Sequence, residues 1–336
     1  MGGNRELNRM KSVLLALFLL AFPRLAAAQA YTVTDLGNLD PVAINNAGQI
    51  VGGNTLWTNG KSVPLVGIDP TALNNRGQVI GADGGPHAIH GSVAHNVHAL
   101  LWQNGRLIDL GTPGMPSQYE ATGINDSDQI IGTSYRHPLL WENGRRTYLP
   151  KLFKDPPYTQ MPCGTGGINN RGQSVGYAAT NNGDTHAVLW QNGRILDLGG
   201  SSGHEARAVA INDHSQIVGY ASLKQFQYRH AMLWQGGKRY DLKTLPGDTD
   251  SRAAAINNRG QIVGNSEKII YVPSLRGFPA RAFFWQNGKM SNLNAFLPSH
   301  SGWHLERAQG INDRGQIIGD GTYNGRPHGF LLTPQS

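Results

Sequence analysis

Cysteine is almost absent from this 336-residue chain, since Cys163 is the only one. No disulfide can therefore form within a monomer. Charged residues make up only 15% of the chain, and no segment shows the 3.6-residue hydrophobic period of helical repeats. Beyond residue 30, no segment is apolar enough to cross a membrane. These absences exclude a disulfide-stapled fold, a helical array and a membrane span in the main body of the chain.

Linear catalytic motifs are missing as well. No G-x-S-x-G, H-E-x-x-H or G-x-G-x-x-G sequence stands in the strand and helix context that such motifs need. Cys163 has no histidine or basic residue beside it, so we do not expect a catalytic thiol. We expect no cofactor and no enzymatic activity, although an enzyme that gathers its groups from separate repeats would lack a linear motif too.

The first 30 residues have the features of a secretory signal peptide. Lys11 precedes an apolar run over 12–22, and small residues follow over 25–30, which predicts cleavage after Ala28 or Ala30. Met10 is the expected natural start, which leaves residues 1–9 as an extension. No cysteine lies directly after the apolar run, so a lipid anchor is not expected. The mature protein is therefore predicted to be secreted or periplasmic.

The charge of the mature chain is only mildly positive. Residues 1–30 contain four basic residues and one acidic residue, so +4 of the total +7 remains. No stretch of consecutive sequence is rich in Lys or Arg, and a nucleic-acid partner is not expected.

Gly is abundant, with 44 residues, and much of it belongs to a repeat. The first repeated element is AINNAGQIVG (43–52), ALNNRGQVIG (72–81), GINDSDQIIG (123–132), GINNRGQSVG (167–176), AINDHSQIVG (210–219), AINNRGQIVG (255–264) and GINDRGQIIG (310–319). The second is TLWTNG (55–60), HALLWQNG (98–105), HPLLWENG (137–144), HAVLWQNG (186–193), HAMLWQGG (230–237), RAFFWQNG (281–288) and the truncated HGFLL (328–332). A third, such as RILDLG (194–199), follows it. Seven copies indicate a repeat architecture.

Each repeat reads as four short strands. Asn-x-x-Gly predicts a turn after the first strand, and Asn-Gly predicts a tight hairpin between the third and fourth. The second and third strands are continuously apolar, so both of their faces should be buried between stacked sheets. A repeat of about 44 residues fits the blade of an all-β, seven-bladed β-propeller. A β-solenoid or tandem sandwiches are the alternatives.

The two ends of the chain predict how the ring closes. The last repeat stops at HGFLL (328–332) without a fourth strand, whereas YTVTDLG (31–37) has the fourth-strand pattern. The N-terminal strand should therefore complete the last blade, so that residues 31–336 form one domain. We expect a monomer.

The motifs INNRGQIVG, HAxLWxNG and DLG resemble the bacterial extracellular HAF repeat, named after its His-Ala-Phe signature. The resemblance covers nearly all of the mature chain. It implies export and a repeat fold, but no established reaction.

The pattern of loop lengths predicts which face carries a binding site. The first and third connections of each repeat are uniform tight turns, whereas every long insertion falls in the other two classes of connection. The insertions include 82–97, 111–122, 149–166, 220–229, 265–280 and 294–309. Binding residues favour loops held by a rigid scaffold, so the face with these insertions is the candidate.

Several residues in these insertions are candidate ligands or ligand contacts. His87, His90 and His95 lie close together near Asp83 and could bind a transition metal, although such loops are usually just solvated. Aromatic and basic side chains could stack on a sugar or anchor a protein, although packing under a long loop is the more common role. These candidates are Phe226, Tyr228, Arg229, Trp303 and Arg307.

The histidine that opens each third strand has a structural explanation. Pairing across Asn-Gly places His98 diagonally beside Asp109, and the same register relates His186 to Asp197. A repeated His–Asp hydrogen bond is therefore expected, rather than a ring of metal ligands. His137, which faces Tyr148, is the exception.

The most favoured function is a non-enzymatic binding module that recognises an extracellular glycan or protein through its long-loop face. The alternative is a propeller enzyme, a lyase or hydrolase, acting on an extracellular polysaccharide or a small polar substrate. A purely structural envelope component is a third possibility.

Overall fold

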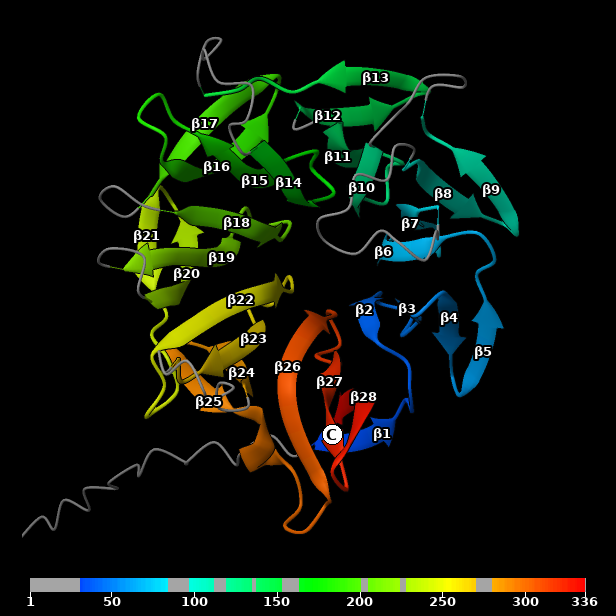
Figure 1. Cartoon of the computed structure of the whole chain (residues 1–336), viewed down its shortest axis with the longest axis vertical. Coiled ribbons are helices and arrows are strands. Elements are labelled where there is room, and N and C mark those ends of the chain that lie inside the picture. Colours follow the sequence, from blue (N-terminus) through cyan, green and yellow to red (C-terminus); the bar gives the residue numbers. More distant parts are fainter. Residues whose placement is uncertain are drawn as a thin grey trace, which may run out of the picture.

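The structure is a computed structural model that describes residues 31–83, 97–111, 119–134, 137–152, 163–200, 205–223, 228–269 and 280–335. Within these residues, 28 strands form seven four-stranded antiparallel sheets around a common axis (Figure 1). The protein is a seven-bladed β-propeller, which confirms the fold predicted from the repeats. No helix in the described segments is long and apolar enough to span a membrane.

Each of the first six blades is a meander of four consecutive strands. Blade 1 contains β2 (Pro41–Ile44), β3 (Ile50–Gly52), β4 (Thr55–Thr58) and β5 (Lys61–Pro64). Blade 2 contains β6 (Asp69–Leu73), β7 (Val79–Ala82), β8 (Ala99–Gln103) and β9 (Arg106–Asp109). Blade 3 contains β10 (Tyr119–Ile124), β11 (Ile130–Ser134), β12 (His137–Glu142) and β13 (Arg145–Tyr148).

Blade 4 contains β14 (Cys163–Ile168), β15 (Ser174–Ala179), β16 (Thr185–Gln191) and β17 (Arg194–Gly199). Blade 5 contains β18 (Ala206–Ile211), β19 (Ile217–Leu223), β20 (Tyr228–Gln235) and β21 (Lys238–Asp241). Blade 6 contains β22 (Asp250–Ile256), β23 (Ile262–Glu267), β24 (Arg281–Gln286) and β25 (Lys289–Asn292), followed by the short 3-10 helix η1 (Leu293–Phe296).

Blade 7 joins the two ends of the chain. It contains β26 (Trp303–Ile311), β27 (Ile317–Tyr323) and β28 (Arg326–Pro334), and its outer strand is β1 (Tyr31–Asp35). Tyr31 pairs with Pro334, and Asp35 pairs with Phe330. The N-terminal strand therefore completes the last blade, as the sequence predicts, and no unpaired edge remains at that junction.

The hydrophobic core lies between neighbouring blades. One cluster joins Leu189 of blade 4 to Ile217 and Trp234 of blade 5, all of them buried. Equivalent clusters lie between other blades. Strands packed on both faces need the continuous apolar runs that the repeats contain.

A buried asparagine fixes each Asn-x-x-Gly turn. In blade 1, Oδ1 of Asn45 accepts hydrogen bonds from the backbone N–H groups of Ala47 and Gln49, and its Nδ2 donates to Gln49 Oε1. The same Nδ2 also donates to the carbonyl of Asn74 in blade 2. The seven equivalent residues repeat these bonds around the ring, so this asparagine both shapes the turn and joins the blades.

The glycine that ends the second repeated strand is required by close packing. The first strand of each blade contains a β-bulge, as between Ala253 and Ala255. Opposite this bulge, a Cβ on Gly264 would overlap the carbonyl oxygen of Arg252. The same overlap with the inner strand would occur at this glycine in every blade. The last residue of Gln-Ile-Val-Gly is therefore glycine because the neighbouring backbone leaves no room for a side chain.

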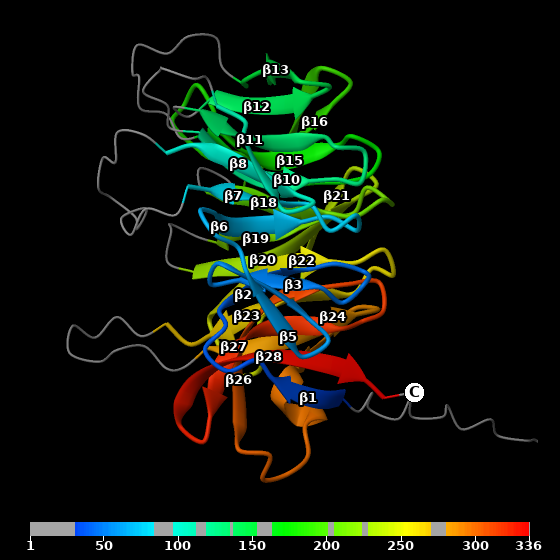
Figure 2. The ribbon, with the colours of Figure 1, turned by 90° about the vertical axis from the view of Figure 1, so that its right-hand side faces the viewer.

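The disc has two different faces (Figure 2). The first and third connections of the blades, which are the tight Asn-x-x-Gly and Asn-Gly turns, lie on what we call the turn face. The second connections and the links between blades lie on the loop face, because successive antiparallel strands reverse direction.

The insertions on the loop face are shorter than the sequence suggests, because strand pairing continues past the repeated core. Segment 220–229 was expected to be a loop, but Ser222 pairs with Arg229 and Leu223 pairs with Tyr228. Segment 294–309 contains most of η1 and the first part of β26, so the expected loop there is also wrong over 303–309.

Candidate functional site

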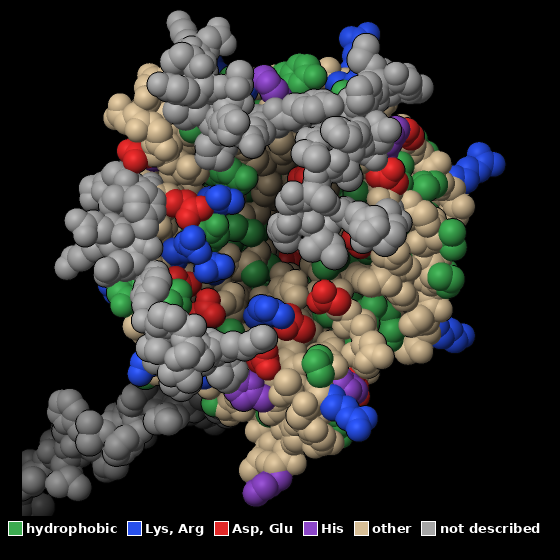
Figure 3. All heavy atoms as spheres, in the orientation of Figure 1, with side chains coloured by type: hydrophobic (Ala, Val, Ile, Leu, Met, Phe, Trp, Pro, Cys, Tyr) green, Lys and Arg blue, Asp and Glu red, His purple; other side chains and the backbone are tan. Residues whose placement is uncertain are grey.

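Seven equivalent residues surround the axis on the loop face, and we call them the mouth. Each lies in or directly before the innermost strand of its blade, five residues before the buried asparagine. In blade order they are Asp40, Asp69, Glu120, Gly164, Arg207, Arg252 and Arg307. Acidic residues therefore occupy three consecutive blades and arginines occupy three others, with Gly164 between them. Figure 3 shows charged side chains of both signs around the central hollow of this face.

The acidic arc consists of Asp40, Asp69 and Glu120. All three residues are exposed. Within the described residues, their carboxylates accept no side-chain hydrogen bond and form no ion pair at contact distance. This half of the mouth therefore presents negative charge to solvent.

The arginine arc consists of Arg207, Arg252 and Arg307, and its members contact carboxylates. Nε of Arg207 lies 2.6 Å from Glu205, and Nε of Arg252 lies 3.4 Å from Asp250. The Arg252 side chain is 38% exposed, whereas that of Asp250 is 1% exposed. In both pairs the guanidinium group is more exposed than its carboxylate partner, so the arginines are the outer charges.

Two tyrosines, one in blade 4 and one in blade 5, contact the arginines of blades 5 and 6. The guanidinium carbon of Arg207 lies 4.1 Å from the ring centre of Tyr177. Those of Arg229 and Arg252 lie 5.6 and 5.7 Å from the ring centre of Tyr220. Burial raises the pKa of Tyr220, so the phenol stays neutral between its arginine neighbours. Cation–π contacts of this kind hold the guanidinium planes in fixed orientations.

Arg307 continues the arc into blade 7. Its Nε and Nη2 bind Asp320 at 3.0 and 2.8 Å, and these bonds raise the pKa of the guanidinium. The Arg307 side chain is 60% exposed. Beside it, a groove of about 350 Å³ separates blade 7 from blade 1 and is lined by Arg307, Asp40 and His328, among others.

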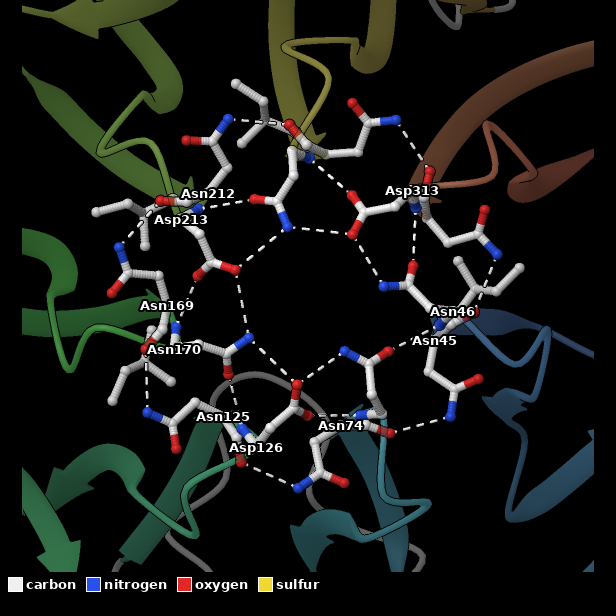
Figure 4. Close-up of a pocket in the computed structure, with 18 of the residues that line it drawn as sticks. Asn45, Asn46, Asn74, Asn125, Asp126, Asn169, Asn170, Asn212, Asp213 and Asp313 are labelled. Carbon is white, nitrogen blue, oxygen red and sulfur yellow. Dashed lines mark hydrogen bonds between the residues drawn. The ribbon is translucent and has the colours of Figure 1, made fainter.

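At the other end of the axis, the turn face carries a ring of Asn and Asp side chains (Figure 4). They surround a hollow of about 240 Å³. In blade order the ring residues are Asn46, Asn75, Asp126, Asn170, Asp213, Asn258 and Asp313. Each Oδ1 accepts a hydrogen bond from the backbone N–H of the preceding blade. Because these backbone bonds fix every side chain, the ring is a structural belt.

The structure places two of the predicted contact residues, Arg229 and Arg307, at the mouth. Arg229 reaches Glu205 at 3.2 Å and belongs with the arginine arc, and Arg307 is part of that arc. Tyr228 is the first residue of β20, beside Arg229. Phe226 lies outside the described residues.

Trp303 packs within blade 7. Its ring stacks on Tyr323 with the ring centres 5.0 Å apart, and it meets His328 and Phe330 edge-on. These contacts give it a role in the blade, and a ligand contact at this residue stays a prediction.

The proposed metal ligands His87, His90 and His95 also lie outside the described residues. Asp83 is described, and its Oδ1 accepts the backbone N–H of His98. Among the described residues, no three His, Cys, Asp or Glu side chains are grouped so that they could hold a metal ion. Cys163 is buried, which raises the pKa of its thiol to about 12 and makes it a poor nucleophile.

The repeated histidines form the hydrogen bonds that the sequence predicts. Nδ1 of His98 lies 2.8 Å from Asp109, and His186, His230 and His328 contact Asp197, Asp241 and Asp35 in the same way. Most of these aspartates also accept the N–H of a glycine two residues later, which explains the Asp-Leu-Gly motif. His137 instead meets the Tyr148 ring edge-on.

Sequence reasoning missed most of the mouth. Asp69, Glu120, Arg207 and Arg252 are single charged residues, each in a different repeat. Their constant position, five residues before Asn-Asn or Asn-Asp, was a usable signal, because equivalent positions of a propeller meet around the axis.

Comparison with known proteins supports the fold and leaves the activity open. A family model described as a protein of unknown function (DUF3466) matches residues 202–328. No curated protein matches the chain.

Among solved structures, the β-propeller domain of the trilobed protease from Pyrococcus furiosus has a TM-score of 0.55 at 8% identity, over 92% of this chain and 97% of that one. A puromycin-hydrolysing peptidase from Mycobacterium tuberculosis has a TM-score of 0.51 at 11% identity, over 87% of this chain and 53% of that one. An inactive virginiamycin B lyase from Staphylococcus aureus, with quinupristin, has a TM-score of 0.50 at 12% identity, over 91% of this chain and 100% of that one. At these identities the likeness is one of fold alone.

Proposed function

We propose that this protein is a non-enzymatic binding module whose ligand lies across the mouth on the loop face. The observation that carries the proposal is the order of charges in the mouth, with three acidic residues, a glycine and three arginines on successive blades. The resemblance of its repeats to the extracellular HAF repeat supports a place outside the cytoplasm, where the ligand would be a protein or a glycan.

The polarity of the mouth favours a protein ligand over a glycan. An acidic glycan would bind the arginine arc but would be repelled by Asp40, Asp69 and Glu120. A neutral glycan would leave both arcs unpaired. A peptide segment can place basic side chains on the acidic arc and acidic side chains on the arginine arc. We therefore propose a protein segment with separated charges of both signs.

The test begins with protein and glycan arrays, probed with protein that starts at Gln29, after the predicted signal peptide. For a ligand so found, Asp69→Asn with Glu120→Gln should weaken binding about tenfold, which corresponds to ~1.4 kcal/mol. Arg207→Gln with Arg252→Gln should weaken it by a similar factor. Both effects should shrink as salt is raised, because exposed charges are screened.

Arg194→Gln with Lys238→Gln is the matched control, because it removes two exposed charges from the turn face. It should leave the affinity unchanged. The proposal would be contradicted if neither mouth variant changed the affinity, or if the control variant changed it as much as they do.

A second function has one observation in its favour. The exposed carboxylates of Asp69 and Glu120 lie on neighbouring blades, and paired carboxylates perform general acid–base chemistry in many enzymes. The second proposal is therefore a lyase or hydrolase. Turnover of an array ligand that is abolished by Asp69→Asn or Glu120→Gln, with binding retained, would favour it.

A further inference from the structure

Basic residues gather on the turn face, although they are scattered in the sequence. The first and third connections of the blades, taken with the one residue on either side of each, contain ten Lys or Arg and five Asp or Glu. All other described residues together contain eleven Lys or Arg and fifteen Asp or Glu. The described part of the molecule therefore has a turn face of net +5 and a remainder of net −4.

Six of these basic residues form a rim, with one in each of the first six blades. Each is the residue that follows the hairpin turn between the third and fourth strands. They are Lys61, Arg106, Arg145, Arg194, Lys238 and Lys289. All six are exposed, and within the described residues none of their side chains forms a hydrogen bond or an ion pair.

Four more arginines lie nearer the axis, on the Asn-x-x-Gly turns. They are Arg76, Arg171, Arg259 and Arg314, and all four are exposed. The acidic residues of this face are engaged in hydrogen bonds. Asp128 binds Arg76 and Gln78, Glu142 accepts from Gln129, and the ring aspartates accept from asparagines. The face therefore keeps a net charge of +5, and its six rim cations have no acidic partner among the described residues.

The first and last described residues also lie on this face. Tyr31 pairs with Pro334 at the turn-face end of blade 7, and Figure 2 shows β1 and the C-terminus together on that side of the disc.

We infer that the turn face docks on an anionic phospholipid bilayer, with the mouth directed away from it. Basic residues near an anionic membrane each contribute favourable energy, and a set spread over a flat face acts together. The described residues outside the turn face have a net charge of −4, so they are not attracted to an anionic surface, and this difference in charge sets the orientation. A bilayer fits better than a nucleic acid, because the cations form a broad ring on one side of a disc rather than a groove. This inference does not depend on the ligand of the mouth.

The test uses protein that begins at Gln29, which lacks the apolar run and contains every residue of the described ring. Its co-sedimentation is measured with vesicles of phosphatidylcholine and with vesicles of an equal mixture of phosphatidylcholine and phosphatidylglycerol. We expect binding only to the anionic vesicles, and release at high salt.

The rim variant carries three substitutions, Arg106→Gln, Arg145→Gln and Arg194→Gln. Its partition coefficient for the anionic vesicles should fall about fivefold for each substitution, and about a hundredfold in all. The matched lysine variant, Arg106→Lys, Arg145→Lys, Arg194→Lys, should bind like the parent protein, because only the charge matters. The control Lys243→Gln, Lys268→Gln, Arg326→Gln removes the same charge from the loop face and should also bind like the parent. Thermal unfolding of each variant shows that the ring is intact.

Three outcomes would overturn the inference. They are unchanged binding by the rim glutamine variant, an equal loss in the loop-face control, or equal binding to the two kinds of vesicle. Binding to a DNA duplex or an acidic polysaccharide without binding to the anionic vesicles would assign the face to another polyanion and would also overturn it.

Discussion

The backbone N–H of Asp313, in blade 7, donates a 2.8 Å hydrogen bond to Oδ1 of Asn46, in blade 1. The same bond joins each blade to the next, so the belt on the turn face continues across the junction between the ends of the chain. Because the Oδ1 atom of each belt residue accepts a backbone N–H, its other side-chain atom faces the neighbouring belt residues. This atom is the donor Nδ2 in an asparagine and the acceptor Oδ2 in an aspartate. Nδ2 of Asn46 donates to Oδ2 of Asp313 at 2.9 Å.

The order of amides and carboxylates in this belt follows from hydrogen-bond matching. An amide beside a carboxylate gives a donor facing an acceptor, and the belt alternates accordingly from Asn75 to Asp313. A closed ring of seven residues cannot alternate completely between amides and carboxylates, so at least one pair of neighbours must be of the same type. That pair is Asn46 and Asn75.

Asp313→Asn should destabilise the ring, because the amides of Asn46 and Asn258 would lose their shared acceptor. The expected loss is about 2–3 kcal/mol of unfolding free energy. Asn46→Asp alone should also destabilise, because it places two carboxylates side by side. The double variant Asn46→Asp, Asp313→Asn only moves the matched pair to blades 6 and 7, so it should regain most of the loss. Denaturant unfolding of the four proteins measures this coupling, and a double variant as unstable as the sum of the singles would contradict the matching rule.

The sequence was sufficient to predict the blades, because each local signal agreed with the global fold. Asn-Gly turns set the register that brings His98 to Asp109, and the incomplete last repeat matched the pattern over 31–37. The mouth was not predicted, because Arg207 and Arg252 are 45 residues apart and neither is unusual by itself. Only the ring symmetry brings such residues together.

Loop boundaries were the weakest part of the sequence analysis. Residues 220–229 carry no repeated motif, yet the backbone pairing of β19 and β20 extends through most of them. Strand pairing depends on the partner backbone as well as on the side chains, so non-repeated sequence can continue a hairpin.

Gly264→Ala should destabilise the protein by at least about 1–3 kcal/mol, since the added methyl group overlaps the backbone of Arg252 and cannot be relieved by a rotamer change. Gly288→Ala is the comparison, because Gly288 has a φ of +83° but open space around it. That change should cost about 1–2 kcal/mol from backbone strain alone. Thermal or denaturant unfolding ranks the two variants. A milder effect at Gly264 would show that the inner strand can move away.

Tyr31→Ala should open the closure of blade 7. The Tyr31 side chain is 1% exposed, and its ring lies 6.0 Å from that of Phe296. Its loss should cost about 3–5 kcal/mol, the range for large aromatic deletions. Tyr31→Phe should be neutral or stabilising. Burial raises the pKa of this phenol to about 12, and its oxygen has no hydrogen-bond partner among the described residues. A large loss in the phenylalanine variant would reveal a partner for the hydroxyl.

The His230–Asp241 pair should make stability depend on acid pH. Burial alone would raise the pKa of Asp241, but hydrogen bonds from His230 and Lys243 lower it well below its usual value. A carboxyl with a lowered pKa in the folded state stabilises the protein above the unfolded pKa of about 3.9, and this contribution is lost as the pH falls through the folded value. Asp241→Asn should therefore cost about 2 kcal/mol at neutral pH. The difference from the parent protein should shrink steadily below about pH 4.

Asn292 gives the matched control, because it occupies the same position in blade 6 and cannot ionise. Asn292→Ala should change the unfolding free energy by an amount that stays constant across the same acid range. Denaturant unfolding of the three proteins at a series of pH values separates the two cases. If the Asp241→Asn difference were also constant down to the lowest pH, the carboxylate would contribute through packing, and the charged hydrogen bonds to His230 and Lys243 would not be what stabilises blade 5.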